Sequence, residues 1–427
     1  QWRKGGEALE ISVVGAGYVG LVTGLCLSEM GHSVTLMEVL EDRVERINRG
    51  ELPIFERDLD DLLERHLGQR FRATTEMGEI VDTELTFICV GTPSREDGGL
   101  DLSHVERAAE EIGSILSRKD GYHLVVVKST LVPGTTRNTL VPLLEDRSGK
   151  RAGEDFGVGV NPEFLREGEA VGDFMHPDRV IVGGIDDASR GRIASLFEGL
   201  DAPVLQVSLS TAEMIKMASN AFLATKISFI NEIGNMCKEI GIDVREVAQG
   251  MGHDPRIGPH FLQAGAGFGG SCFPKDLRGL AAESSRRGIP ARICRAVEEV
   301  NEAQPLRLVE LLERHLELAG ARIGVLGLAF KPGTDDVRES RSVSLVNALL
   351  ERGARVGCHD PQAVDNFKGL FPTLEYHERA EDCVNGSDAV VLMTEWEEYS
   401  DPEMYGDTLV LDGRGVVRTK NYEGICW

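Results

Sequence analysis

The chain has 427 residues, 41% of them hydrophobic, so it can form two or three domains with sizeable cores, and it lacks the apolar run of roughly 18 residues that would predict a membrane span. Lys and Arg number 46 and Asp and Glu 70, giving a formal net charge of −24, which argues against binding to nucleic acid and to anionic membranes. The eight cysteines are scattered and form no Cys-x-x-Cys pair, which argues against a disulfide framework or a structural metal site and favours a reducing cytoplasm.

The first predicted elements follow the polar start QWRKGGEALEIS, which lacks the apolar stretch of a signal peptide. A strand is predicted over residues 11–14, then a glycine turn, an apolar helix and a second strand over 34–37. Further strands are predicted over 85–90 and 123–127. Strands that alternate with helices predict a parallel sheet covered on both faces.

The glycine turn, GAGYVG at residues 15–20, matches G-x-G-x-x-G between a strand and a helix, the context of a dinucleotide-binding loop. Such glycines let the backbone approach a pyrophosphate, and the helix N-terminus supplies N–H donors. Glu38 ends the second strand, where a carboxylate binds ribose hydroxyls and repels a 2′-phosphate, so NAD is predicted rather than NADP. The loops VGTP (90–93) and KST (128–130) follow later strands and are predicted to line the same crevice.

A charged turn follows in NPEFLREG, where Glu163 and Glu167 lie four residues apart. One carboxylate could polarise a water molecule while the other orients the cofactor or a sugar. A solvated charged turn is the alternative.

A long helix is predicted to follow Ser210 and Glu213, which have capping-box spacing, and to end near Gly241. About 30 residues at 1.5 Å each make a rod roughly 45 Å long, able to join two domains and to form a dimer seam; a plain buried core helix is the alternative. Lys216 and Asn220 share one face of it among apolar neighbours. A cation beside an amide would suit an oxyanion, and a snorkelling Lys with an exposed Asn is the alternative.

Five glycines precede and surround Cys272 in GAGFGGSCFPKDLRGL. If a helix begins at Pro274, Cys272 lies near its N-terminus, where a thiolate is stabilised. Lys275 and Asp276 would then lie within reach. This setting predicts a reactive thiol, and a buried structural cysteine in a turn is the alternative.

A second strand–helix–strand unit is predicted from a strand at 322–326, a helix at 342–352 and a strand at 355–358, with later strands at 389–393 and 409–411. The predicted fold class is therefore α/β, with two Rossmann-like, doubly wound parallel-sheet domains joined by a long central helix and a helical linker domain. The predicted boundaries are 1–207 for the NAD-binding domain, 208–306 for the central helical domain, and 307–427 for the second sheet domain.

With these motifs, and with KMASNAF and GLAFKPGTDDVRES, nearly the whole chain resembles the nucleotide-sugar dehydrogenases of the UDP-glucose/GDP-mannose dehydrogenase family. The resemblance implies oxidation of UDP-glucose to UDP-glucuronate with two NAD and water, through a thiohemiacetal and a thioester on the cysteine. It also implies that residues 208–306 form the dimerisation and catalytic domain and that residues 307–427 bind the UDP-sugar. A homodimer or larger homo-oligomer is implied as well. One departure is Gly91, where the family often has Asn.

The resemblance also implies roles for individual residues. The catalytic positions are Cys272, Lys216, Asn220, Asp276, Glu163 and Thr130. The cofactor-contacting positions are Gly15, Gly17, Tyr18, Val19, Gly20, Glu38, Arg43, Thr92, Thr130, Glu167, Lys275 and Arg338. The substrate-binding positions are Glu163, Phe164, Leu165, Lys216, Asn220, Arg256, Phe261, Leu262, Gly269, Lys331 and Arg414, with Arg256 reaching a neighbouring subunit's site.

Alternatives remain at this point. GDP-mannose and UDP-N-acetylhexosamine dehydrogenases share the mechanism, although the latter usually depart from Ser-Cys-Phe-Pro-Lys-Asp, and RIGPHFLQAG favours UDP-glucose. A hydroxyacid dehydrogenase would need no cysteine nucleophile. A non-catalytic NAD-binding regulator would leave Cys272, Lys216 and Asn220 unexplained.

Overall fold

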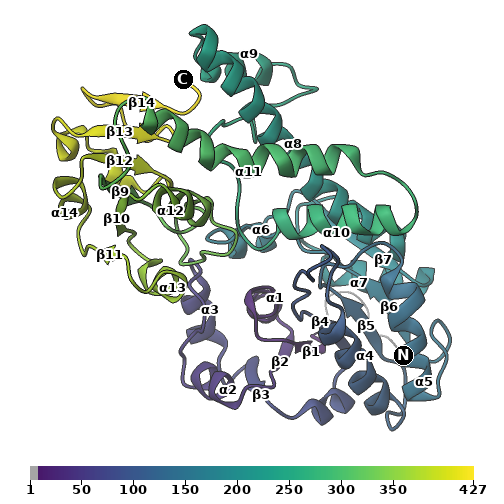
Figure 1. Ribbon diagram of the computed structural model, residues 1–427. Helices are drawn as coiled ribbons and strands as arrows, with labels where there is room; N and C mark the ends of the chain where they lie inside the picture. Colours follow the sequence, from purple (N-terminus) through teal and green to yellow (C-terminus); the bar gives the residue numbers. More distant parts are fainter. Residues whose placement is uncertain (1–7) are drawn as a thin grey trace. The chain divides into compact units, whose positions relative to one another are not determined.

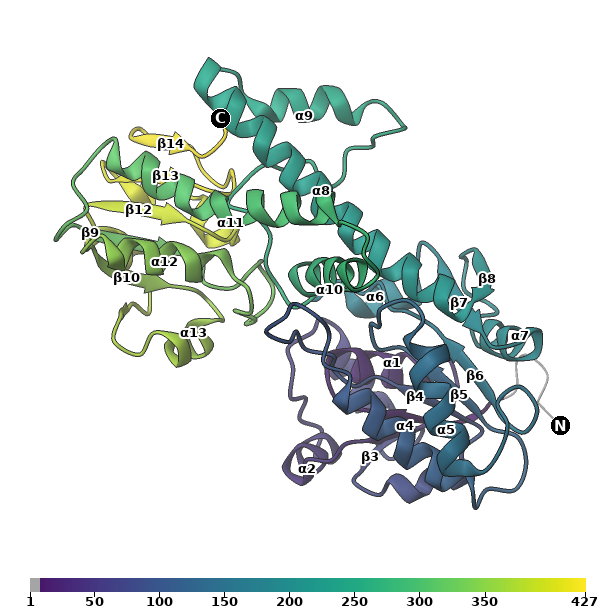
Figure 2. The same cartoon turned by 45° about the vertical axis from the view of Figure 1, so that its right-hand side comes forward.

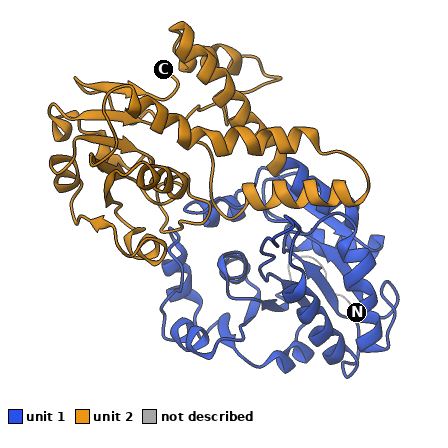
Figure 3. Ribbon diagram, viewed as in Figure 1, with its two compact units in different colours: residues 1–219 blue, residues 220–427 orange. Residues whose placement is uncertain are grey.

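The computed structural model describes residues 8–427 and divides into two compact units (Figure 3). Unit 1 extends to Ser219 and unit 2 covers Asn220–Trp427, so the division falls inside the long helix α8 (Leu209–Ile240). Most of the polar start, on which the expectation of no signal peptide rests, lies outside the described residues. No helix within residues 8–427 combines the length and the apolarity that crossing a bilayer needs.

Unit 1 is built on an eight-stranded sheet in the order β3-β2-β1-β4-β5-β6-β7-β8 (Figure 1). All neighbouring strands pair in parallel except β6 and β7. The α/β class is confirmed, but β7 and β8 run against the other six strands, which the sequence did not predict. The strands are β1 (Glu10–Val14), β2 (Ser33–Met37), β3 (Phe71–Thr74), β4 (Leu85–Ile88), β5 (Leu124–Val127), β6 (Gly157–Val160), β7 (Val180–Gly184) and β8 (Val204–Ser208).

Helices cover both faces of this sheet because its central strands are apolar on both sides. In β5, Val126 belongs to one buried cluster, while Val125 and Val127 belong to another on the opposite face. The first cluster includes side chains of α1 (Tyr18–Glu29), α3 (Leu59–His66), α6 (Ala170–Met175) and α7 (Asp187–Leu196). The second includes side chains of α4 (Ser103–Leu116), α5 (Val141–Ser148) and the start of α8.

Unit 2 contains a six-stranded, all-parallel sheet in the order β11-β10-β9-β12-β13-β14, as the sequence predicted for its main strands. Buried clusters again lie on both faces. The strands are β9 (Arg322–Leu326), β10 (Arg355–His359), β11 (Glu375–Tyr376), β12 (Ala389–Leu392), β13 (Leu409–Asp412) and β14 (Tyr422–Gly424). The helices packed on them include α12 (Arg341–Glu351), α13 (Val364–Leu370) and α14 (Ala380–Asn385).

Three helices matter most for the site: α8, α10 (Phe273–Arg286) and α11 (Arg292–Glu313). Figures 1 and 2 show α10 beside α11, and side chains of both pack with α8 residues in one small buried cluster. The long helix was predicted correctly, but its capping box was wrong. Ser208, not Ser210, accepts the N–H of Thr211, and the Glu213 carboxylate instead accepts the N–H groups of Gly134 and Thr136 at 2.6 and 2.8 Å.

A buried histidine in the core of unit 1 is expected to make the free energy of unfolding depend on pH. His123 Nδ1 lies 3.0 Å from the carbonyl of Thr83, which only accepts, so Nδ1 carries the proton and Nε2 accepts from the Thr86 hydroxyl at 2.8 Å. Burial first, and then the charge of Lys119, lowers the pKa of His123 to about 3. The neutral ring is therefore the native form.

Because the unfolded chain takes up this proton at higher pH than the native protein, the free energy of unfolding falls as pH drops below about 6.5 and keeps falling toward about 3. We expect His123→Gln to make the pH dependence of unfolding shallower by about 1.4 kcal/mol per pH unit between pH 6 and 4. Urea titrations at several pH values measure this slope, with exposed His253→Gln as the control. Equal slopes for wild type and His123→Gln would refute it.

Candidate active site

The glycine loop after β1 has the geometry that a dinucleotide needs. Gly15 has a φ of +104°, and its N–H donates to the Met37 carbonyl at 2.8 Å. A Cβ on Gly20 would lie 1.8 Å from the carbonyl oxygen of Gly15, so only glycine lets α1 approach the strand this closely. A Cβ on Gly17, the N-cap of α1, would meet nothing within 4 Å. Open space in front of the N-terminus of α1 fits a bound pyrophosphate.

Glu38 follows β2 directly and its side chain is 9% exposed. Oε1 accepts the N–H groups of Val39 and Leu40, while Oε2 accepts that of Ala16 in the glycine loop and pairs with Arg43 at 3.3 Å. The carboxylate is thus fixed beside the glycine loop, as a ribose-binding acid would be.

Glu38→Ala tests this assignment. We expect NAD affinity to fall by roughly tenfold, because a hydrogen bond to a charged acceptor is lost, and discrimination against NADP to weaken, because Arg43 is released toward a 2′-phosphate. Titration of both cofactors by protein fluorescence measures this. Unchanged NAD affinity would remove Glu38 from the ribose site.

The loops after β4 and β5 are joined, as their places at the carboxyl ends of adjacent strands predict. The Thr92 hydroxyl donates to the Thr130 carbonyl at 2.9 Å. The Ser129 hydroxyl donates to the Val90 carbonyl at 2.6 Å. Both loops therefore belong to one surface of unit 1, near the point where the strand order reverses between β1 and β4.

A buried ion pair joins Glu163 to helix α8. Lys216 Nζ lies 2.7 Å from Glu163 Oε1, and the two side chains are 4% and 6% exposed. Burial would raise the pKa of the Glu163 carboxyl, but Lys216 and the N–H of Leu165 outweigh it and hold that pKa below its ordinary value. Lys216 also lies 5.4 Å from the ring centroid of Phe164. The snorkelling Lys is excluded, and Glu163 is not solvated, although Arg166 and Glu169 of the same turn are exposed.

The predicted reactive cysteine caps a helix, as its sequence context indicated. Cys272 is the N-cap of α10, and its carbonyl accepts the N–H of Asp276 at 2.9 Å. Pro274 is the second helical residue rather than the first. Asp276 is fully buried, and its carboxylate accepts from Asn220 Nδ2 at 2.6 Å and Lys275 Nζ at 2.7 Å. Cys272 is half-buried, whereas six of the other seven cysteines are buried.

Several of the remaining predicted residues belong to unit 2. Arg256 is 88% exposed and pairs with Asp254 at 2.6 Å, and Arg338 pairs with Asp336 at 2.6 Å. Phe261 has a left-handed φ of +63°. The other predicted residues lie as follows: Leu262 is buried, Lys331 lies 5.9 Å from the Phe330 ring, and Arg414 Nε donates to the Met393 carbonyl at 2.8 Å.

Sequence reasoning missed Glu56, a buried carboxylate in unit 1. It accepts the hydroxyl of Tyr18, in the glycine loop, and the N–H groups of Gly168 and Ala170 at 2.6 and 2.9 Å. Glu56 therefore ties the loop that carries Glu167 to the start of α1. No local pattern marks it among 70 acidic residues.

Lys128 of the KST loop was predicted only as part of that loop, yet it is 4% exposed. Its Nζ donates to Asn161 Oδ1 at 2.9 Å and lies 5.5 Å from the Phe174 ring centroid. Burial lowers its pKa.

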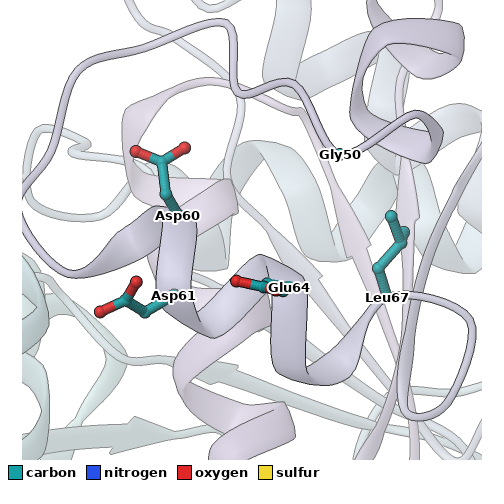
Figure 4. Close-up of a pocket in the computed structure, with 5 residues that line it drawn as sticks. All are labelled: Gly50, Asp60, Asp61, Glu64 and Leu67. Carbon is teal, nitrogen blue, oxygen red and sulfur yellow. The ribbon is translucent and has the colours of Figure 1, made fainter.

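A surface pocket of unit 1 is separate from these residues (Figure 4). Three carboxylates from α3 line it together with Gly50 and Leu67: Asp60, Asp61 and Glu64. Such a lining repels phosphate groups, and no predicted site residue contributes to it.

Three domains of one family match the chain. They are described as the NAD binding domain, the central domain and the UDP binding domain of the UDP-glucose/GDP-mannose dehydrogenase family, and they match residues 9–201, 210–303 and 324–419.

Individual proteins are similar over the full length. The UDP-glucose 6-dehydrogenase AglM of Haloferax volcanii is 44% identical, with 98% of this chain and 100% of that protein covered. A GDP-mannose 6-dehydrogenase of Pseudomonas putida is 36% identical, with coverages of 98% and 100%. The solved structure of a UDP-glucose dehydrogenase from Pyrobaculum islandicum has a TM-score of 0.94 at 41% identity and 100% coverage of both chains.

The doubly wound sheet, the glycine loop and the matched NAD binding domain define the class: this protein is an NAD-dependent oxidoreductase. Over nearly its whole length the chain belongs to the UDP-glucose/GDP-mannose dehydrogenase family.

Proposed function

We propose that this enzyme oxidises UDP-glucose to UDP-glucuronate in two successive two-electron steps. The observation that carries the proposal is Cys272 at the N-cap of α10, in the same turn as an Asp276 carboxylate held by Asn220 and Lys275. A hydroxyacid dehydrogenase or an NAD-binding regulator would have no use for a thiol in this setting. The 44% identical relative is named a UDP-glucose 6-dehydrogenase, which favours this sugar over GDP-mannose.

In the first step the C6 alcohol becomes an aldehyde, losing a hydride and a proton. NAD, when bound, accepts the hydride of each oxidation. The residues proposed to hold NAD are the glycine loop, Glu38, Arg43, Thr92 and Arg338. Lys216 and Asn220 are proposed to stabilise the oxygen as it loses its proton.

In the second step the Cys272 sulfur bonds to the aldehyde carbon and the oxygen takes a proton, giving a thiohemiacetal. Loss of a hydride from that carbon and a proton from its oxygen gives a thioester. Asp276 is proposed to assist the proton transfers at the cysteine.

Water then adds to the thioester carbonyl, and the carbon–sulfur bond breaks to release the carboxylate and the thiol. Thr130 and Glu163 are proposed to hold and activate this water. Glu163 is held as a carboxylate by Lys216, the form that can accept a proton from water.

We also propose that the chain has three domains, with boundaries after residues 207 and 306, and that the third domain binds the UDP group. The enzyme is proposed to form a homodimer, since α8 presents exposed apolar side chains at Phe222, Phe229 and Met236. A reducing cytoplasm is the proposed compartment. No disulfide forms within residues 8–427.

Substrate identity is tested by incubating the enzyme and NAD with UDP-glucose, GDP-mannose and UDP-N-acetylglucosamine separately. We expect kcat/KM for UDP-glucose to exceed the others by at least about 100-fold, since a pocket that hydrogen-bonds one base and sugar rejects poor matches strongly. A higher kcat/KM for GDP-mannose or for UDP-N-acetylglucosamine would show that UDP-glucose is not the preferred substrate. The protein would still be a nucleotide-sugar dehydrogenase.

A further inference from the structure

The glycine-rich loop before Cys272, residues 265–271, is held by a set of buried amide side chains that the reaction scheme does not use. Asn231 comes from α8, and Asn301 and Gln304 come from α11. They are 0%, 4% and 1% exposed. We call these three residues the amide clamp.

Asn301 makes the central contact. Its Oδ1 accepts the N–H of Phe268 at 2.7 Å, and its Nδ2 donates to the carbonyl of the same residue at 3.0 Å. One side chain thus pairs with both backbone groups of Phe268, as a neighbouring strand would. Pro305, four residues later, has no N–H for the helical bond to the Asn301 carbonyl, so α11 continues past this point with that one hydrogen bond missing.

The other two amides hold the beginning of the loop. Asn231 Oδ1 accepts the N–H of Gly265 at 2.8 Å, and Gln304 Nε2 donates to the Gly265 carbonyl at 2.8 Å. Asn231 Nδ2 has no hydrogen-bond partner within the part of the chain that the structure describes. Burying such a group lowers stability, and the bond to Gly265 at the start of the loop is what Asn231 provides in return.

The loop is closely packed at two of its glycines. A Cβ on Gly267 would lie 2.6 Å from Asn301 Oδ1, and one on Gly269 would lie 2.4 Å from the Glu339 carbonyl oxygen. The N–H of Gly270 donates to the Arg338 carbonyl at 3.0 Å. Glu339 itself has a left-handed φ of +52°, a conformation that persists only where the surroundings impose it.

We propose that the amide clamp positions Cys272: it fixes the path of residues 265–271 and so sets the place and orientation of the thiol at the start of α10. Asn301 is the principal positioning residue, and Gln304 and Asn231 support it. Only the expected loss of turnover when Cys272 is misplaced rests on the proposed function, because the contacts that hold the loop involve no substrate.

The test compares Asn301→Leu with Ser228→Ala in the full-length enzyme. Ser228 is buried, and its hydroxyl donates to the Val297 carbonyl of α11 at 2.7 Å, so its loss weakens the same α8–α11 packing without touching the loop. Each variant is measured for Tm, for kcat and both KM values, and for the pH dependence of Cys272 alkylation by iodoacetamide, followed by peptide mass. Gln304→Met is the second clamp variant, should Asn301→Leu fail to fold.

We expect the clamp variants to lose kcat by at least tenfold with KM for NAD within twofold, and the pH midpoint of Cys272 alkylation to rise by at least half a unit. Ser228→Ala should keep kcat within twofold at a comparable loss of Tm. Equal kcat and equal alkylation profiles in clamp and control variants would overturn the proposal. If wild type forms no NADH from any sugar nucleotide, the proposed function fails while the alkylation profiles still decide the clamp.

Discussion

Replacing Cys272 by alanine is expected to lower UDP-glucuronate formation by at least about 10⁴-fold, as loss of a catalytic nucleophile does, while NAD binding is unchanged. In the proposed mechanism no thiohemiacetal forms without the thiol, so the aldehyde carbon does not become the tetrahedral centre from which the second hydride leaves. Chromatography of the sugar nucleotides measures the acid, and fluorescence titration measures NAD binding.

The matched control is Cys294→Ala, which removes the other half-buried thiol, on α11. It should retain native turnover. Formation of UDP-glucuronate by Cys272→Ala at the native rate would refute the thioester route.

Replacing Lys216 by methionine is the second large expected effect. It leaves the Glu163 carboxylate buried without its cation, which costs about 3–5 kcal/mol of unfolding free energy, and it removes a proposed oxyanion partner, which lowers kcat by about 10²- to 10³-fold. The pKa of Glu163 should rise, since Lys216 is what offsets its burial. Urea unfolding and steady-state kinetics measure the two effects.

Two further variants separate stability from catalysis. Lys216→Met combined with Glu163→Gln removes both buried charges and should regain much of the stability but none of the activity. Lys420→Met breaks an ion pair whose members are 81% and 85% exposed, and it should leave the unfolding free energy nearly unchanged. If the double variant had native turnover, the Lys216–Glu163 pair would have no role in catalysis and would serve stability alone.

The features that could be predicted from the sequence depend on neighbouring residues. The glycine loop and the cap at Cys272 were predicted correctly because a strand, a tight turn and a helix start are specified within about ten residues. The second sheet was predicted from strands that are short and fully apolar, such as β12. The family resemblance rested on the same local motifs, and the matched domains confirm it.

The features that could not be predicted from the sequence depend on contacts between distant segments. Glu213 fits a capping box by spacing, but its bonds go to residues 77 and 79 positions earlier. Glu56 contacts a loop 112 residues later, and Asn301 pairs with a backbone 33 residues away. The reversal of β7 and β8 likewise follows from packing rather than from a local pattern.

Counting the NADH formed per sugar distinguishes the proposed four-electron oxidation from a two-electron one. Limiting UDP-glucose is incubated to completion with excess NAD, and NADH is measured by absorbance. We expect two NADH per UDP-glucose, with UDP-glucuronate as the product. One NADH per sugar, with an aldehyde as the product, would contradict it.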